Sequence, residues 1–367
     1  MEAHTRSRNT RFRRTCLALA TALLGSVGLA STIGLQSASA DQPDPVTDNS
    51  SVSAPAQVYN PDSGAVESLS AANEDVLRNY WTQERLDNAI PLNVTSPQTP
   101  APDDSSQLPQ PDPGPQTTIQ PAAPTQPQPA RPDTSEAVSN FSHTNGKVFF
   151  HNATDGKDYN CSASAVASGS RSMVATAGHC VHGGPGGTWH QNWVFIPGYH
   201  KGTHPNGTFP ARSSRTMQDW INYGENARGF NSDVAFVSTY PNENGAKVVD
   251  AVGGHGLIWG GDQYEFDADI FGYPLNLDGG EVMWACWGKT GTRYQFYWGF
   301  YKFSQISGCN FGGGSSGGPW LMNYDNGNGL GLIKSITSFG PTDSTEYSAG
   351  PFFRSAIGEM YQAADND

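Results

Sequence analysis

Glycine is spread unevenly along this chain of 367 residues, and its distribution limits the possible folds more than any other feature. Of the 42 glycines, 37 lie beyond residue 134, where they interrupt the apolar runs every few residues. A long helix is unfavourable under such interruption, because a glycine inside a helix costs about 1 kcal/mol relative to alanine. The pattern therefore excludes a helical bundle or a coiled coil for this part of the chain.

The apolar runs between these glycines have the composition of β-strands. They are short, rich in aromatic and β-branched residues, and bounded by Gly, Asn or Pro, which favour turns. We expect strands at residues 147–150, 193–196, 234–237, 268–273, 294–298 and 330–336. Frequent short strands joined by turns predict an all-β domain of the sandwich or barrel type. The C-terminus differs, because its apolar residues recur at helical spacing and predict one short helix: Phe352, Phe353, Ile357, Met360 and Tyr361.

Residues 1–40 have the parts of a secretory signal peptide. Five arginines precede an apolar stretch, and Ala38-Ser39-Ala40 supplies the small residues that signal peptidase accepts. Because such a segment is removed, we expect a secreted, extracellular protein without stable membrane anchoring. An uncleaved anchor is the alternative, since the apolar stretch is close to spanning length.

Residues 41–134 have a composition of their own, with 17 of the 26 prolines. From Pro91 to Pro132 the prolines alternate with Gln, Asp and Thr, and too few apolar groups are present to offset the entropy of ordering. We expect a propeptide here that includes an extended, solvated Pro/Gln-rich linker, followed by one globular domain at residues 135–367.

One island inside this region is more apolar. Between residues 65 and 92 the apolar residues recur at steps of three and four, which predicts one or two short amphipathic helices that end at Pro91. Two interpretations remain open. The island is either a transient helix in a disordered tail or a propeptide element that docks on the downstream domain.

The cysteines point to an oxidising compartment. Cys16 lies in the signal peptide, and the other four form an even set: Cys161, Cys180, Cys286 and Cys309. We favour the pairs Cys161–Cys180 and Cys286–Cys309, because each closes a short loop and would contribute about 3 kcal/mol. A four-cysteine zinc site is the competing interpretation, but the sequence has no C-x-x-C pair.

Charge and motifs exclude several other classes of function. The formal net charge of −13 argues against a nucleic-acid partner, which needs a surplus of Lys and Arg. The zinc-peptidase motif H-E-x-x-H is absent, and no cofactor or metal is implied.

The strongest chemical signal is the sequence Gly-Ser-Ser-Gly-Gly-Pro at residues 314–319. Glycines on both sides of Ser316 permit a sharp turn that exposes its hydroxyl and leaves backbone N–H groups free to point at one spot. These are the requirements of a nucleophile beside an oxyanion hole. An apolar strand follows at once, which distinguishes the turn from a flexible linker.

A nucleophilic serine needs a base, and the sequence offers one upstream. An apolar strand ends in Thr-Ala-Gly and then His179, and Asp233 begins another apolar strand. A buried carboxylate at Asp233 could hold the imidazole of His179 in the required tautomer. The three motifs together predict a Ser-His-Asp arrangement.

In this order the motifs T-A-G-H-C, D-V-A and G-x-S-G-G-P resemble the chymotrypsin/trypsin-like serine peptidases, most closely the secreted bacterial members that include the glutamyl endopeptidases. The resemblance covers roughly residues 140–350. It implies two antiparallel six-stranded β-barrels with the active site between them, and a secreted endopeptidase that acts on protein or peptide substrates. The family's disulfide beside the catalytic histidine matches Cys161–Cys180.

The family's roles carry over motif by motif. The resemblance implies that Ser316 attacks the scissile carbonyl, that His179 accepts and returns the proton, and that Asp233 orients His179. It also implies an oxyanion hole formed by the backbone N–H groups of Gly314 and Ser316.

The sequence departs from the trypsin pattern before the nucleophile. Trypsin-type enzymes carry an Asp there that pairs with the new N-terminal amine after activation, and this chain has Ser315. That ion pair cannot form, so maturation should work differently. We expect the chain's own propeptide to block the cleft or to assist folding.

The primary pocket also departs from known specificities. The resemblance assigns Asn310 to this pocket, where preference for Lys or Arg needs an Asp, and it assigns Ser338, Phe339 and Gly340 to the wall that pairs with the substrate backbone. Glutamyl endopeptidases have a His before that Ser, and this chain has Thr337. The pattern therefore supports neither Lys/Arg nor Glu specificity and leaves a neutral, polar or apolar side chain at the cleaved residue open.

Two other functions share some of these sequence features. The G-x-S-x-G elbow of the α/β-hydrolases needs a histidine after the serine, and none follows Ser316. A catalytically inactive peptidase-fold module that binds through exposed tryptophans remains the alternative from a different class. Labelling of Ser316 distinguishes it from an enzyme.

Overall fold

The computed structural model describes residues 49–70, 73–96, 111–129, 141–296 and 300–367 of the chain. The signal peptide predicted for residues 1–40 lies outside these residues. Among the helices of the described part, none is both long enough and apolar enough to cross a membrane.

The first half of the globular part closes into a β-barrel. Its six strands pair antiparallel in the order β10-β11-β8-β7-β6-β9, and pairing of β9 with β10 completes the ring. The strands are β6 (Asn145–Asn152), β7 (Lys157–Val166), β8 (Met173–Thr176), β9 (Gln191–Pro197), β10 (Phe209–Met217) and β11 (Ala235–Thr239). Closure leaves few unpaired strand edges, and apolar side chains such as Val148, Phe195 and Phe236 are buried.

The second half consists of two further sheets. Six strands follow the order β14-β13-β17-β18-β12-β5, and three follow β15-β16-β19. Their bounds are β5 (Thr117–Ile119), β12 (Gly256–Trp259), β13 (Asp267–Gly272), β14 (Trp284–Lys289), β15 (Gly291–Phe296), β16 (Phe300–Ser307), β17 (Pro319–Asp325), β18 (Leu330–Ile336) and β19 (Tyr347–Pro351). A bridge between Phe339 and Ala349 joins the two sheets.

The predicted all-β, two-barrel class is confirmed, and each predicted strand overlaps an observed one. The second barrel differs in detail from the antiparallel expectation, because β12 runs parallel to β18. Its outer strand β5 comes from the Pro-rich region, which was expected to be solvated. Residues 111–129 are extended, as expected, but part of them pairs with the sheet.

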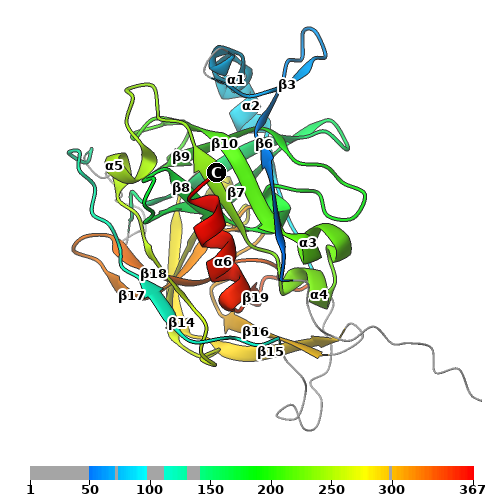
Figure 1. Ribbon diagram of the computed structural model, residues 1–367, viewed down its shortest axis with the longest axis vertical. Coiled ribbons are helices and arrows are strands. Elements are labelled where there is room, and N and C mark those ends of the chain that lie inside the picture. The colour runs from blue at the N-terminus through cyan, green and yellow to red at the C-terminus, as the bar shows by residue number, and fades with distance from the viewer. Residues whose placement is uncertain (1–48, 71–72, 97–110, 130–140, 297–299) are drawn as a thin grey trace, which may run out of the picture. The chain divides into compact units, whose positions relative to one another are not determined.

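The predicted C-terminal helix is confirmed as α6 (Ser355–Ala364). It contacts β10, β11 and β12, and it lies toward the viewer in Figure 1, where it is drawn in red. Its apolar face is buried, and the Tyr361 hydroxyl donates to the carbonyl of Ala167 at 2.6 Å. Three short helices lie in the loops: α3 (Gln218–Tyr223), α4 (Ala227–Phe230) and α5 (Val248–Val252).

The island predicted at residues 65–92 forms two helices, which confirms that expectation. They are α1 (Glu74–Tyr80) and α2 (Gln83–Asn88), and the Thr82 side chain caps α2 by accepting from the Arg85 amide. Short strands precede and follow the two helices in the chain. β1 (Ser51–Pro55) pairs with β10, β2 (Gln57–Tyr59) pairs with β3 (Val66–Ser68), and β4 (Ile90–Pro91) pairs with β7. In the structure the island is docked rather than transient, since Leu77 and Leu86 are buried in the main core.

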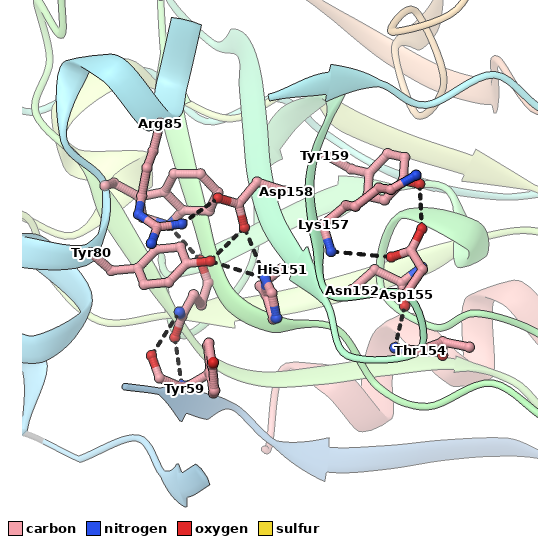
Figure 2. A network of polar contacts seen from close by, with 12 residues as sticks. Tyr59, Tyr80, Arg85, His151, Asn152, Thr154, Asp155, Lys157, Asp158 and Tyr159 are labelled. Carbon is pink, nitrogen blue, oxygen red and sulfur yellow. Dashed lines mark hydrogen bonds and ion pairs between the residues drawn. The ribbon is translucent and has the colours of Figure 1, made fainter. Parts of the chain in front are cut away.

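A polar network fixes the two helices to the barrel (Figure 2). Asp158 of β7 receives hydrogen bonds from the Tyr80 hydroxyl at 2.5 Å and from the Arg85 guanidinium at 2.8 Å. Nδ1 of His151 lies 2.9 Å from the same carboxylate, and the ring of Tyr59 stacks on His151. The carboxylate therefore joins two helices and two strands at one point.

Both predicted disulfides are present. Cys161 pairs with Cys180 and Cys286 pairs with Cys309, with Cα–Cα distances of 6.3 and 5.5 Å. Because these four sulfurs are paired with one another, they do not form the competing four-cysteine zinc site.

Candidate active site

His179 lies in a tight 3-10 turn, Gly178–Cys180, directly after β8. A Cβ at Gly178 would lie 2.8 Å from Thr216 Oγ1 and 3.0 Å from Asp233 Oδ1, so only glycine fits there. The disulfide from Cys180 to Cys161 attaches the turn to β7. The backbone of His179 is therefore held in place on two sides.

A neighbouring histidine supports this turn without adding a charge. Burial lowers the pKa of His190 to about 3, so its ring is neutral at physiological pH. Its Nε2 lies 3.0 Å from the carbonyl of His179 and donates to it. His190 lies in no motif, so the sequence alone does not distinguish this supporting role from that of any surface or packing histidine.

Asp233 is completely buried and accepts three hydrogen bonds. Its Oδ1 accepts from the backbone N–H of His179 at 2.8 Å, and its Oδ2 accepts from His179 Nδ1 at 2.7 Å and from the Ser338 hydroxyl at 2.6 Å. These donors offset the cost of burying the carboxylate. They also keep the proton of a neutral imidazole on Nδ1, which leaves Nε2 as the basic nitrogen.

The basic nitrogen of this pair is not engaged. His179 Nε2 is buried and has no hydrogen-bond partner among the described residues. The neighbouring Cys180 Sγ lies 3.9 Å from the carbonyl oxygen of Ser316, so the histidine turn is packed against the serine turn. Catalytic hydrogen bonds commonly tighten only when substrate is bound.

Ser316 lies in a turn that both halves of the fold hold. Gly314 and Gly317 have φ values of +89° and +79°, which favour glycine. From the first barrel, the backbone N–H of Ser162 donates to the Ser316 carbonyl at 2.7 Å, and its hydroxyl donates to the Gly314 carbonyl at 2.8 Å. From the second half, the carbonyl oxygen of Phe271 packs directly against Gly318. A Cβ atom at residue 318 would lie only 2.1 Å from this oxygen, so only glycine fits there. The turn therefore lies at the junction between the two halves.

One of the two groups predicted for the oxyanion hole already binds a peptide carbonyl. The backbone N–H of Gly314 donates to the carbonyl of Leu92 at 2.8 Å. This N–H is thus free of intra-turn bonds and oriented to donate to an oxygen atom next to the Ser316 turn.

A cavity of about 180 Å³ opens beside Ser316. Ser338, Phe339 and Gly340, which the resemblance assigns to the pocket wall, are among its lining residues. None of its lining residues within the described chain has a charged side chain: Asn93, Val94, Leu275, Asn276, Phe311, Gly312, Gly313, Ser315, Ser316, Thr337, Ser338, Phe339, Gly340, Pro341, Thr342, Ser344, Thr345 and Ser348.

Asn310 lies outside this lining, although the resemblance assigned it to the pocket. It is exposed, its Oδ1 accepts from the Thr345 hydroxyl, and its carbonyl accepts from Asn276 Nδ2 at 2.8 Å. Asn310 therefore holds two residues that do line the cavity. Other loop residues that line the cavity, such as Thr342 and Thr345, lie in no sequence motif and were not predicted as pocket residues.

Arg354 is a further residue that the sequence analysis missed. Its side chain is buried and donates to the Asn231 carbonyl at 2.8 Å and to the Ser232 hydroxyl at 3.0 Å. Burial lowers its pKa to about 10, so it stays charged at neutral pH. The only signal was a charge inside the apolar C-terminal run. Arg354 fixes the two residues that precede Asp233.

The described residues include one group with metal-ligand geometry, Cys161, His179 and Cys180. Its two cysteine sulfurs are bonded to each other, so they are not available as thiolate ligands. The group is therefore accounted for by the disulfide beside the histidine turn.

No protein-family model matches the chain, and no curated protein matches it. Solved structures do match. A thermostable serine protease, AL20, from an extremophilic microorganism has 31% sequence identity and a TM-score of 0.53, covering 61% of this chain and 98% of that one. The protease Anisep from Arthrobacter nicotinovorans has 28% identity and a TM-score of 0.52, covering 62% and 98% respectively.

Proposed function

Because the chain belongs to the chymotrypsin/trypsin-like serine peptidases, we propose that it is a secreted serine endopeptidase that uses Ser316, His179 and Asp233. One observation carries this proposal above the others. The imidazole of His179 is bound to a buried carboxylate at 2.7 Å through Nδ1, while Nε2 is buried without a partner among the described residues. This is the arrangement of a general base held in readiness.

The reaction follows from this arrangement. Ser316 Oγ attacks the scissile carbonyl while His179 Nε2 takes its proton, and the N–H groups of Gly314 and Ser316 stabilise the negative oxygen. His179 then gives the proton to the leaving amine, and an ester to Ser316 remains. Water, deprotonated by His179, hydrolyses that ester and restores the serine. Loss of one oxyanion donor typically costs about 10²–10³ in rate.

The cavity supports a substrate with a neutral side chain at the cleaved residue. A charged side chain would lose water without meeting an opposite charge, which is costly. The hydroxyls and amides of residues such as Asn276 and Thr345 suit small polar or apolar groups.

The proposal also assigns the rest of the chain. Residues 1–40 serve as the signal peptide, residues 41–134 as the propeptide and residues 135–367 as the peptidase domain. The two disulfides support a location in an oxidising, extracellular compartment. The substrates are proteins or peptides, and the chemistry needs no cofactor.

The test is reaction with a fluorophosphonate serine probe. Ser316→Ala and His179→Ala should abolish labelling of the folded protein, and Ser307→Ala, at an exposed serine, should leave it unchanged. If the folded wild type and a form freed of its N-terminal segment both stay unlabelled, the inactive binding module takes the place of the enzyme.

A further inference from the structure

An extended segment of the chain lies across the candidate active site. We call residues 91–96 the strap. The strap bonds to the first barrel, where the Leu92 N–H donates to Asn160 O at 2.9 Å, and to the serine turn, where Leu92 O accepts from Gly314 N–H at 2.8 Å. It then bonds to the pocket wall, where Val94 O accepts from Gly340 N–H at 3.3 Å and the Ser96 N–H donates to Gly340 O at 3.0 Å.

The side chains of the strap fill the surroundings of Ser316. Val94 is only 5% exposed and belongs to a cluster of aromatic residues that includes Trp220, Phe230 and Phe339. Asn93 and Val94 line the cavity beside Ser316. At the end of the strap the Ser96 hydroxyl accepts from Gln295 Nε2 at 2.7 Å, and this bond is buried. A substrate must displace the strap before its own chain can use these groups.

The direction of the strap is defined at both ends. Strand β4, which leads into it, pairs parallel with β7, with Pro91 opposite Asn160. Thr95 forms a parallel bridge with Gly340. The N-terminal end therefore lies beside Cys161 and the histidine turn, and the C-terminal end lies on the pocket wall.

A substrate must run the other way, and this step rests on the proposed function. The acyl half of a substrate precedes the scissile bond and lies along the pocket wall, Ser338 to Gly340. The leaving amine takes its proton from His179, so the following residues lie on the side of the histidine turn. Substrate polarity along the cleft is thus opposite to that of the strap.

We propose that residues 91–96 are a built-in inhibitor that binds the active site in reversed polarity and so blocks it without being cut. In the reversed direction, the residues that follow any strap carbonyl run toward the pocket wall and away from His179. The nitrogen of that peptide bond therefore cannot receive a proton from His179 and leave. Leu92 O nevertheless occupies Gly314 N–H, which a reacting carbonyl needs. Because α1 and α2 hold the segment next to the cleft, its effective concentration is high.

The test weakens the strap by one charge. Val94→Asp puts a carboxylate among aromatic side chains, and Val66→Asp is the matched control, because Val66 is exposed in the same N-terminal segment. The full chain carrying Val94→Asp should react with the fluorophosphonate probe about tenfold faster or more than the wild type and the Val66→Asp control. Equal rates would overturn the inhibitory role.

A second readout does not depend on catalysis. In the Ser316→Ala background, Val94→Asp should speed amide hydrogen exchange at Gly314 and Gly340, and Val66→Asp should not. If exchange becomes faster but the fluorophosphonate probe labels neither the wild type nor the variants that keep Ser316, the proposed peptidase function is rejected. The strap then remains as a segment bound in the cleft. Unchanged exchange at both glycines would reject the strap.

The polarity has its own test. A synthetic peptide with the sequence of residues 91–96 should slow labelling of the Val94→Asp protein and should stay intact, as followed by mass spectrometry. Cleavage of this peptide within the strap sequence would show that it binds in the direction of a substrate and would overturn the reversed polarity.

Discussion

At the scale of single residues, Asp233 is the most constrained charge in the site, with three donors on a carboxylate that has no exposed surface. In Asp233→Asn the new amide can donate to His179 Nδ1, which moves the ring proton to Nε2 and removes the base. We expect kcat to fall by about 10⁴ with little change in KM, because the imidazole is then held in the wrong tautomer to act as a base.

The measurement is steady-state hydrolysis of a peptide by the Val94→Asp protein, with and without Asp233→Asn. Asp62→Asn is the control, because Asp62 is exposed on the hairpin of β2 and β3. A loss below about tenfold would contradict the orienting role of Asp233.

Arg354 acts on the same carboxylate from a distance. Its guanidinium bonds to Asn231 and Ser232, so Arg354→Met leaves buried acceptors without donors and should lower the free energy of unfolding by about 1–3 kcal/mol. Because the loop before Asp233 loosens, kcat should fall while KM stays near the wild-type value.

Arg354→Lys separates positioning from simple destabilisation. It keeps the charge but loses the planar fork, so it should recover part of the stability and less of kcat. If kcat tracks the free energy of unfolding in both variants, Arg354 is only a structural residue.

The sequence permits prediction of some of these residues and not others. His179, Asp233 and Ser316 lie in short motifs whose residue types indicate a base, an orienting carboxylate and a nucleophile. The two disulfides could be inferred because each closes a short loop. Arg354 could not, because its partner Asn231 is 123 residues away and only the packing of α6 brings them together. The place of Asn310 behind the cavity lining likewise depends on a loop conformation that no motif encodes.

At the scale of elements, the docking of α1 and α2 should depend on pH. Burial raises the pKa of Asp158, but the hydrogen bonds from His151, Tyr80 and Arg85 outweigh it, and the pKa lies below its ordinary value of 3.8. The contribution of this carboxylate to the docking free energy is thus fully present at pH values above the ordinary pKa of an aspartate. It is lost as the pH falls through the lowered pKa of Asp158. Hydrogen exchange in α1 and α2 should rise below about pH 4.

Figure 2 supplies the control for this prediction. Asp158→Asn should raise exchange in both helices at neutral pH and remove most of the acid transition. Asp155→Asn should do neither, because Asp155 bonds to Tyr159 and the Lys157 amide within its own hairpin. Equal effects of the two variants would show that the hairpin, and not the carboxylate, controls docking.

The disulfide between Cys286 and Cys309 links β14 to the segment after β16. Replacing both cysteines by alanine should lower the free energy of unfolding by about 3 kcal/mol, because the loop of 23 residues gains freedom in the unfolded state. Urea unfolding measures this change. An unchanged midpoint would mean that the bond adds no net stability to the native state.

The strands and helices could be predicted because their signals are local. Glycine-bounded apolar runs marked the strands, and the three- and four-residue steps between residues 65 and 92 marked α1 and α2. Pairing could not be predicted, because it joins distant residues. The parallel contact of β12 with β18 and the addition of β5 from a Pro-rich segment depend on edges that exist only in the folded barrel.

At the scale of the whole molecule, the N-terminal region contacts both halves of the fold. On one side β1 pairs with β10 and the two helices pack on the first barrel, and on the other side β5 pairs with β12. The strap lies between these two attachments. The region therefore connects the halves whose junction holds Ser316.

Because of these attachments, activation depends on dissociation of the N-terminal fragment from the peptidase domain. A cut after the strap breaks the covalent link to the peptidase domain, but the N-terminal fragment that carries the strap stays bound through β1, α1 and α2. Nicked protein should then label faster on dilution and slow again on concentration, while nicked Val94→Asp should show no such dependence. Such rebinding of the fragment would keep the enzyme inactive at high concentration and release its activity as it is diluted away from its source.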